Sequence, residues 1–497
     1  MASKTPLAHI VSPGEYSVRW FLPTDDGGTR PLEGNVDLAA LRGPRGQMFG
    51  DVPFEWSVAA EGRSKFVGLP QRFEYPLLAG RLRSNHVIYL IDVTLDTWFE
   101  DRAEIYARCA LVGLPGIEQS DVFAAMRVQT TFMDRIAGEP PLAKFGIPFQ
   151  NSNEPIKWWA QQSGELPLKW ESGSGSMRLG FDLRARTGDP YEMTIRYSPV
   201  VTAYFDDPLP LDEVLFGWAE PLRGISTIIM GKRSEITFVS LGVKSTTQDE
   251  SDIRYMQLYG SGITQAPYAA QRWSGRESRP ALTLKQDNVS LIDLVDGWRT
   301  HTRAQHPLYE TYVSVLGVRD DHPRSRFLLL LQALEGHYGH ERRTQLRKKQ
   351  LSYEKKRESH IENLLSSGDL QQPTKTFLKK YLPRSSPRGL NEVLTWATGA
   401  LPGDVADQIG DCALVTGVIA SETARLAAED PPSPAPPPTW QDALRKVRND
   451  LAHGNRAYDE YDLQEVTEHL DRVVRAHVLR TLGAADEILL RLLEPTS

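Results

Sequence analysis

Arginine, asparagine and histidine stand close together in the stretch RKVRNDLAHGN, residues 445–455. Arg448 carries a planar, permanently charged guanidinium that suits phosphoryl oxygens. His453 can accept or release a proton near neutral pH, and Asn449 can orient either group through hydrogen bonds. These residue types suggest three explanations: a structural helix end, a nucleic-acid contact, or the active site of a nuclease.

A helix expected over residues 439–453 must position these side chains. Thr439 can cap its first turn, with Asp442 three residues later as the partner in a capping box, and Gly454 suits its C-terminal cap. Arg448 and His453 lie about 140° apart on an ideal helix. Fraying of the helix after His453 would let its imidazole swing toward Arg448, so that the polar side chains could converge on one phosphate.

Three other arginine–histidine pairs can be compared with this one: Arg81/His86, which have the same spacing of five residues, Arg299/His306, which are seven residues apart, and Arg472/His477, which again have a spacing of five. Chance predicts about three such pairs at this composition, so spacing without context is uninformative. The first pair fits a surface hairpin, the second stands beside a proline at the expected domain junction, and the third lies inside a long helix. Only Arg448/His453 combines a helix end, a polar residue after the arginine and a following glycine.

A structural explanation of the stretch is equally concrete. A histidine in the last turn interacts favourably with the helix dipole. Arg448 can pair with an acid of the surrounding helices, and Asn455 can take the left-handed position after the helix. Spacing and side-chain chemistry alone slightly favour this explanation.

The chain changes character near residue 295. Before it, short apolar or alternating runs recur between turn residues, as expected of strands: YSVRWFLP, HVIYLIDVTL, EMTIRYSPVVTAYF, ISTIIMG and SEITFVSLGV. We therefore expect a multidomain protein whose residues 1–295 form sandwich-like sheets, in one or two subdomains. Residues 296–497 have helical spacing and predict an all-α bundle.

Helices are expected at residues 291–305, 324–351, 372–382, 389–398, 405–429, 439–453 and 460–493. The proline-rich stretch DPPSPAPPP, residues 430–438, interrupts them as a linker, since proline cannot continue a helix.

Composition agrees with a folded cytoplasmic protein. Of 497 residues, 40% are hydrophobic and 24% are charged, which is ordinary for globular proteins. The two cysteines, Cys109 and Cys412, form no C-x-x-C pair, which fits a reducing compartment. We find no secretory signal pattern and no apolar run long enough to span a membrane, so no membrane partner is expected.

Positive charge gathers in one segment although the net charge is −7. Residues 341–390 contain 13 Lys and Arg against 5 Asp and Glu. Such a run is most often a solvated helix face; the alternative is a surface that guides RNA by its phosphates. Lys348 and Lys349, together with Arg445, are the candidate substrate-binding residues.

The motif RNDLAHG resembles the signature of the HEPN superfamily, in which an arginine, a polar residue and a histidine stand near a helix end in a small α-bundle. The segments RFLLLLQALEGHY, LVDGWRTHTRAQHPLYETY and WFLPTDDGGTRPLEGNV add a similarity to ApeA-type anti-phage proteins. Those proteins join a β-rich N-terminal domain to a C-terminal HEPN domain. The resemblance covers the whole chain in architecture and is specific over the motif and its flanking helices.

This resemblance implies a metal-independent endoribonuclease. His453 would act as general acid or base for attack of a ribose 2′-OH on the adjacent phosphate. Arg448 would stabilise the negative charge of the transition state, and Asn449 would orient the histidine or the phosphate. Catalytic HEPN domains usually dimerise, so that two motifs form one composite site.

The same resemblance implies partners. RNA, including tRNA, would be the substrate, the chain would form a homodimer or a larger homo-oligomer, and a phage-derived trigger would act on the N-terminal domain to release a silent nuclease. One alternative stays open: a non-catalytic HEPN module for interaction or RNA binding, beside a β-rich domain that binds a ligand or a protein.

Glu335, His337 and His340 raise the question of a metal. The two histidines have i, i+3 spacing, but no cysteine or Glu-x-x-His partner appears at matching spacing, so we expect no metal site. Glu335 and the two histidines are instead expected to line either the bundle face or the mouth of the active site, as possible supports of the site. Whether Arg448 is the partner of Glu335 stays open. No phosphate-binding glycine loop is present, and no cofactor is expected.

Overall fold

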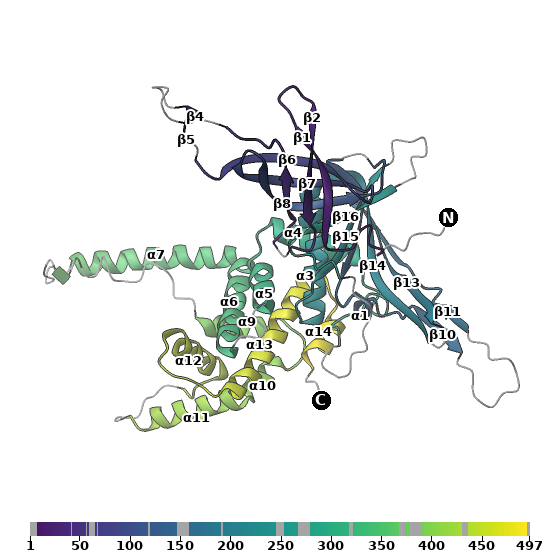
Figure 1. The fold of residues 1–497 in the computed structure, drawn as a ribbon. Helices are drawn as coiled ribbons and strands as arrows, with labels where there is room; N and C mark the ends of the chain where they lie inside the picture. Colours follow the sequence, from purple (N-terminus) through teal and green to yellow (C-terminus); the bar gives the residue numbers. More distant parts are fainter. Residues whose placement is uncertain are drawn as a thin grey trace, which may run out of the picture. The chain divides into compact units, whose positions relative to one another are not determined.

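The computed structural model describes residues 7–494, apart from residues 41, 56, 59–64, 67, 118–119, 147–158, 190–191, 245–252, 267–278, 318–321, 367–370, 372, 375, 377–388 and 430–435. The chain divides into two compact units, Met1–Asp296 and Gly297–Ser497, one residue from the boundary expected from the sequence. The first unit is β-rich and the second is helical (Figure 1).

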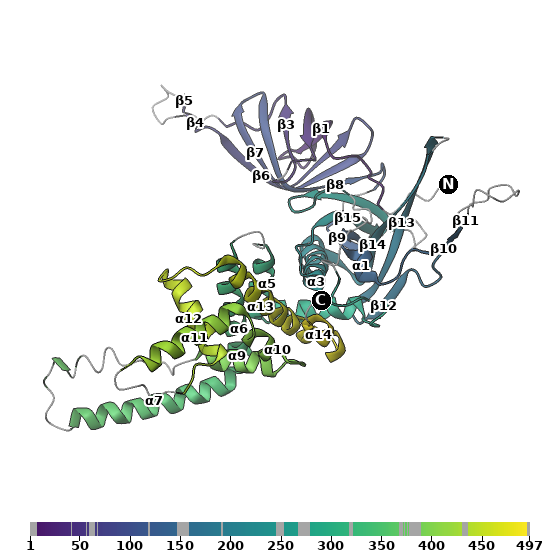
Figure 2. The ribbon, with the colours of Figure 1, turned by 90° about the horizontal axis from the view of Figure 1, so that it is seen from below.

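Six strands of the first unit close into a barrel (Figure 2). They are β1 (Glu15–Pro23), β2 (Thr29–Asp37), β3 (Arg45–Phe49), β6 (Gln71–Leu82), β7 (Val87–Phe99) and β8 (Arg102–Gly113). The order is β8-β3-β2-β1-β6-β7, and β7 pairs back to β8 with antiparallel neighbours throughout. Alternate side chains fill the interior, among them Trp20, Leu78 and Ile88, which are fully buried.

The same sheet continues beyond the barrel. β8 pairs with β7 on one edge, while its other edge pairs with β3 at residues 102–106 and with β16 at residues 109–112. The further strands follow in the order β16 (Ile253–Gly260), β15 (Ile236–Lys244), β9 (Val122–Thr130), β14 (Glu192–Pro210), β13 (Gly175–Asp189) and β12 (Leu168–Ser172). This arrangement differs from the expected sandwich of separate sheets. Because β8 is long enough to pair with both β3 and β16 along one edge, a single sheet forms the closed barrel and also extends beyond it.

Two short hairpins complete the strands of this unit: β4 (Ser57–Val58) with β5 (Lys65–Phe66), and β10 (Leu142–Gly146) with β11 (Trp159–Gln162). The expected hairpin at Arg81/His86 is confirmed as the β6–β7 connection.

Helices in the first unit correct one strand prediction. They are α1 (Met133–Ala137), α2 (Leu211–Val214), the π-helical turn η1 (Leu215–Ala219) and α3 (Glu220–Met230). The run ISTIIMG, expected as a strand, belongs to α3 and its C-terminal cap Gly231. A short apolar run fits a buried helix as well as a buried strand, and residues 224–230 are all buried.

The second unit is built from helices that mostly follow the sequence pattern. The boundary between the units falls within α4 (Leu291–Arg303). The helices that follow are α5 (Pro307–Gly317), α6 (Pro323–Glu341), α7 (Arg343–Ser366), α9 (Leu390–Gly399), α10 (Val405–Gly410), α11 (Ala413–Ala427), α12 (Trp440–His453), α13 (Glu460–Thr481) and α14 (Asp486–Leu493). None of the helices in the described residues is both long enough and apolar enough to cross a membrane.

Three helices expected to be continuous are broken. Residues 324–351 divide into α6 and α7 at Arg342, and residues 405–429 divide into α10 and α11 at Asp411 and Cys412. Residues 460–493 divide into α13 and α14 around Gly483, whose φ of 89° is left-handed. Most of the helix expected at residues 372–382, and residues 430–435 of the linker, lie outside the described residues. The basic helix α7 extends away from the other helices of its unit (Figures 1 and 2).

A buried ion pair joins two long helices of the bundle core. Arg326 on α6 contacts Asp471 on α13 at 3.1 Å, and the two side chains are 3% and 11% exposed. The hydroxyl of Tyr312 on α5 donates to the same carboxylate at 3.2 Å. Three helices are therefore fixed to one another by a single buried carboxylate.

We expect Asp471→Asn to lower the free energy of unfolding of the helical unit by about 3–5 kcal/mol, because it leaves the charge of Arg326 buried without its counter-ion. Denaturant unfolding followed by helical circular dichroism measures the change. Glu468→Gln, an exposed position one turn earlier on α13, is the matched control. An equal, small effect of both substitutions would contradict the role assigned to this pair.

Candidate functional site

Helix α12 begins at a capping box, as predicted. The Thr439 hydroxyl accepts a hydrogen bond from the Asp442 backbone N–H (3.3 Å), and the Asp442 carboxylate accepts one from the Thr439 backbone N–H (3.1 Å). The Asn391 amide on α9 donates to the same carboxylate at 2.7 Å. Burial raises the pKa of Asp442, but these hydrogen bonds outweigh it and hold the pKa below its usual value.

One face of α12 packs into the bundle and the other stays open. Ala443, Leu444, Val447 and Leu451 form its buried stripe, with the spacing of an amphipathic helix. Asn449 and His453 are exposed and Arg448 is half-buried. The buried stripe therefore determines which way the three candidate catalytic residues face.

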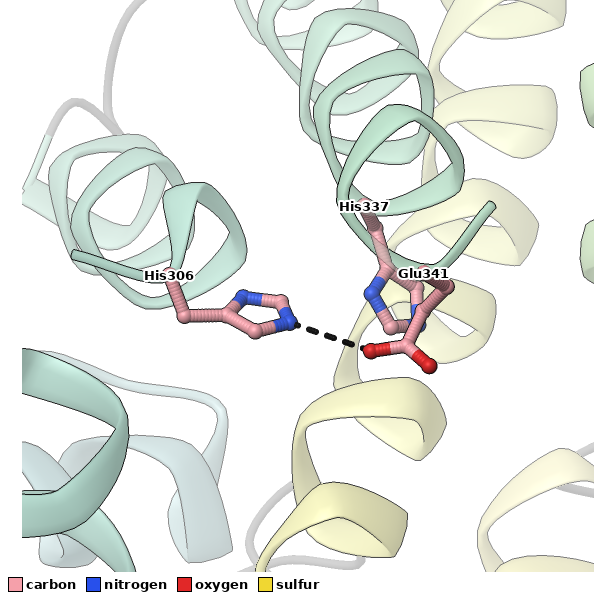
Figure 3. Close-up of side chains that lie close together, drawn as sticks. All are labelled: His306, His337 and Glu341. Atoms are coloured by element: carbon pink, nitrogen blue, oxygen red, sulfur yellow. Dashed lines mark ion pairs between the residues drawn. The ribbon is translucent and has the colours of Figure 1, made fainter. Parts of the chain in front are cut away.

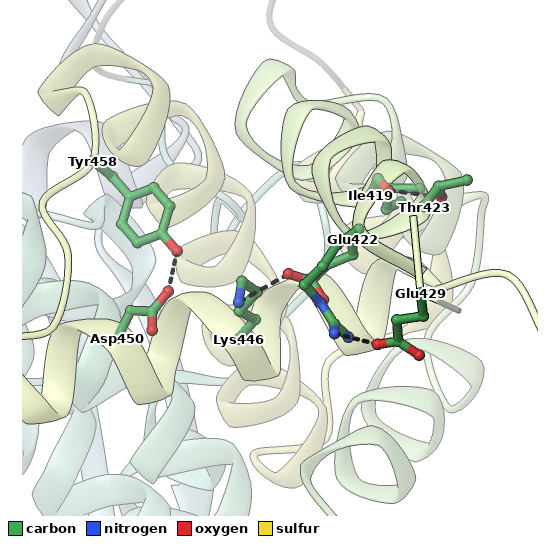
Figure 4. Close-up of polar contacts among 8 residues, drawn as sticks. Ile419, Glu422, Thr423, Glu429, Lys446, Asp450 and Tyr458 are labelled. Atoms are coloured by element: carbon green, nitrogen blue, oxygen red, sulfur yellow. Dashed lines mark hydrogen bonds and ion pairs between the residues drawn. The ribbon is translucent and has the colours of Figure 1, made fainter. Parts of the chain in front are cut away.

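The C-terminal end of α12 is held in place. Gly454 takes the predicted left-handed cap with a φ of 69°, and its N–H donates to the Asp450 carbonyl. Tyr458, beyond the turn, donates its hydroxyl to the Asp450 carboxylate at 2.6 Å (Figure 4). The Arg324 guanidinium donates to the Leu451 carbonyl. The expected fraying is not seen: His453 is the last residue of an ordered helix.

Figure 4 also shows how α12 is attached to α11. Lys446 on α12 forms an ion pair with Glu422 at 2.9 Å, and Glu422 in turn accepts from Arg425 at 2.9 Å. Hydrogen bonds from Lys446 and Arg425 lower the pKa of Glu422. The candidate residues thus lie on a helix that is tied at its start, its middle and its end.

Arg448 has two polar neighbours. Its Nη1 donates to Oδ1 of Asn449 at 3.2 Å, and its Nη2 lies 3.8 Å from Oε2 of Glu335 on α6. The pairing of Glu335 with Arg448, which the sequence left open, is thus present as a long contact. In the described part of the chain no hydrogen bond joins Arg448 to His453.

The contact between Arg448 and Glu335 is too weak to occupy the arginine. The two side chains are 40% and 36% exposed, and ion pairs of this kind contribute roughly 0–1 kcal/mol. A phosphate, which can take two parallel hydrogen bonds from a guanidinium, competes well with such a partner. Arg448 is thus available to an anion such as a phosphate.

The other predicted residues are distributed differently from the expectation. Arg445 pairs with Asp442 at 3.0 Å, and Lys349 pairs with Glu392 at 3.1 Å, whereas Lys348 is exposed on α7. His337 lies on a buried face of the bundle, which is one of the two places expected for it. Side chains two residues apart on a helix point in nearly opposite directions, about 200° around the axis. Glu335 and His337 therefore cannot belong to the same site.

His337 belongs to a buried aromatic cluster. Its ring centroid lies 5.3 Å from that of His306, 4.8 Å from that of His477 and 5.1 Å from that of Trp396. Burial, aided by the neighbouring histidines, lowers the pKa of His337 to about 2, and burial lowers that of His477 to about 4. Both rings are neutral at physiological pH.

His306 and His337 of this cluster could hold a metal ion together with the carboxylate of Glu341. His306, His337 and Glu341 bring one ligand atom each to within 4.8 Å of one another (Figure 3). Sequence reasoning missed this group because it tested His337 only against His340. The i, i+4 spacing of His337 and Glu341 was the available signal, whereas the approach of His306 depends on tertiary packing.

The chain was compared with protein-family models, curated proteins and solved structures, and none of them matches.

We expect Thr439→Ala to destabilise the protein by about 1 kcal/mol, because it removes the side-chain acceptor for an otherwise unpaired N–H in the first turn of α12. Thr439→Ser keeps the hydroxyl and serves as the control. The stabilities of the two variants are compared through the denaturant concentration at the midpoint of unfolding. If the serine variant lost as much stability as the alanine variant, the cap would not be the cause.

Proposed function

We propose that this chain is a HEPN-type endoribonuclease in which Arg448, Asn449 and His453 act on RNA without a catalytic metal ion. The observation that carries the proposal is their position on the open face of a helix fixed at both ends. A rigid support of this kind keeps the geometry of an acid–base site constant. The resemblance of RNDLAHG to the HEPN signature supplies the class of reaction.

The proposed reaction uses the ribose 2′-OH as nucleophile. The His453 imidazole takes the proton of that hydroxyl, its oxygen forms a bond to the adjacent phosphorus, and the bond from phosphorus to the 5′ oxygen breaks. A second acid protonates the leaving oxygen. Arg448 holds the phosphoryl oxygens as their negative charge increases. The products carry a 2′,3′-cyclic phosphate and a 5′-OH.

A second copy of the chain would complete this site. One chain supplies one His453, whereas the reaction needs a base on one side of the phosphate and an acid on the other. Two α12 helices brought together in a homodimer would supply two histidines and two arginines. This supports a dimer, or a larger oligomer with paired helical units, as the active form.

Control by the N-terminal unit is part of the proposal. An active ribonuclease in the cytoplasm destroys the RNA of its own cell, so low resting activity is needed. On the ApeA-like interpretation, the β-rich unit recognises a phage-derived trigger and shifts the helical unit to its active state. RNA cleavage, of tRNA or other transcripts, then halts the infected cell.

A non-catalytic module for interaction or RNA binding is the second candidate function. The contact of Arg448 with Glu335 and the bond of Tyr458 to Asp450 favour it, because both give the end of α12 a structural role. The two candidates differ in what loss of His453 does: an enzyme loses activity, whereas a binding module does not.

We expect His453→Ala to lower the rate of RNA cleavage at least roughly 100-fold, as for the loss of a general acid or base. The assay uses total RNA and tRNA in the presence of a chelator, with helical circular dichroism recorded in the same buffer. His360→Ala, an exposed histidine on α7, is the control. The toxicity of each variant when it is expressed in cells provides a second measurement of the difference between His453→Ala and His360→Ala.

Cleavage that persists in His453→Ala would rule out this active site. Cleavage of an oligonucleotide that lacks 2′-OH groups would rule out the mechanism.

We expect Lys348→Gln combined with Lys355→Gln to weaken RNA binding, because both lysines are exposed on the basic helix α7 and lie seven residues apart on the same face. The slope of log affinity against log salt should fall by up to about 0.7 for each phosphate that the variant no longer neutralises. Lys169→Gln, an exposed lysine of the first unit, is the control. An unchanged slope would show that α7 is only a solvated helix.

A further inference from the structure

The group formed by His306, His337 and Glu341 lies apart from the residues proposed for catalysis. His337 and Glu341 stand one turn apart on α6, and His306 comes from the connection between α4 and α5. Nε2 of His306 lies 3.6 Å from Oε1 of Glu341 (Figure 3). Three side chains from two segments thus present one nitrogen or oxygen each to a common point.

Two ring nitrogens of this group are buried without a hydrogen-bond partner. Nε2 of His306 and Nδ1 of His337 are both in this state, and the two residues are each 3% exposed. Buried polar atoms of folded proteins are almost always paired, so each exception needs a cause. A cation between the two rings would accept a lone pair from each nitrogen and remove both exceptions at once.

We propose that His306, His337 and Glu341 bind a zinc ion that fastens the α4–α5 connection to the end of α6. Two imidazoles and one carboxylate are a ligand set that zinc takes in proteins. The set leaves one coordination position for water or a fourth ligand. The ring centroid of His340 lies 4.2 Å from that of His306.

The distances allow an ion after a small closure. Ligand atoms bound to one tetrahedral zinc lie about 3.3 Å apart, since each bond is about 2.0–2.1 Å. The pair of His306 and Glu341, at 3.6 Å, is already near this value. The largest separation in the group is within 4.8 Å, and the Glu341 side chain, 45% exposed, is free to move inward.

One hydrogen bond must be given up. Nδ1 of His306 accepts from the Leu308 backbone N–H at 3.3 Å, which places the ring proton of neutral His306 on Nε2. Zinc at Nε2 moves that proton to Nδ1, so this hydrogen bond breaks. It is longer than an ordinary N–H hydrogen bond and correspondingly weak, whereas two unpaired nitrogens gain a ligand bond.

The test is zinc binding by the full-length chain after removal of metal by a chelator and dialysis. Calorimetric titration with zinc chloride should give one ion per chain for the wild type, and Glu341→Gln should bind at least ten-fold more weakly. Glu310→Gln, an exposed glutamate on α5, is the control and should bind as the wild type does. His306→Asn removes Nε2 but keeps an acceptor for the Leu308 N–H, so its loss of binding would not follow from a missing cap.

Thermal unfolding provides the second measurement. Zinc should raise the melting temperature of the wild type and of Glu310→Gln, because a ligand that binds only the folded state stabilises it, and should not raise that of His306→Asn. The proposal is overturned if the wild type binds no zinc, or if Glu341→Gln and His306→Asn both bind it as the wild type does. These readouts do not involve RNA cleavage, so they are independent of the function proposed above.

Discussion

The helical unit depends on one buried carboxylate. Asp471 accepts from Arg326 and from Tyr312, and so joins α13 to α6 and to α5. Taking two charges out of water costs several kcal/mol for each ion, so the pair is tolerated only where the surrounding helices hold its geometry. Helix α6 also packs against α12 and α9. The places of the candidate active site and of the histidine group therefore both follow from how this pair fixes α6.

Helix α6 carries an exposed ion-pair contact on one side and a buried histidine on another. On one side Glu335 faces Arg448 across a solvent-accessible contact, where the pair is weak and a phosphate can compete. On another side His337 is buried among neutral aromatic rings, where the pKa of its imidazole is too low for it to exchange protons near neutral pH. His453 is exposed on α12, whereas the buried histidines suit packing or a metal ion.

The arrangement of α12 explains how a site can be rigid and still open. Its apolar stripe is buried, its first turn is capped by Thr439 and Asp442, and its last turn is tied through Asp450 to Tyr458. None of these contacts uses the side chain of His453 or Asn449. The residues that fix the helix are thus different from those that would meet RNA, which leaves the second group free to contact a substrate or another copy of the chain.

The sequence alone determined the features that depend on neighbours along the chain. Periodicity and turn residues indicated the β-rich and helical parts, and Thr439, Asp442 and Gly454 defined both ends of α12 because caps are local. Strand β8 closes a barrel through pairings far apart in sequence, ISTIIMG becomes helix α3 because burial overrides a short apolar pattern, and His306 reaches His337 through helix packing. Local sequence patterns could not predict these three features, since each depends on which distant segments meet in space.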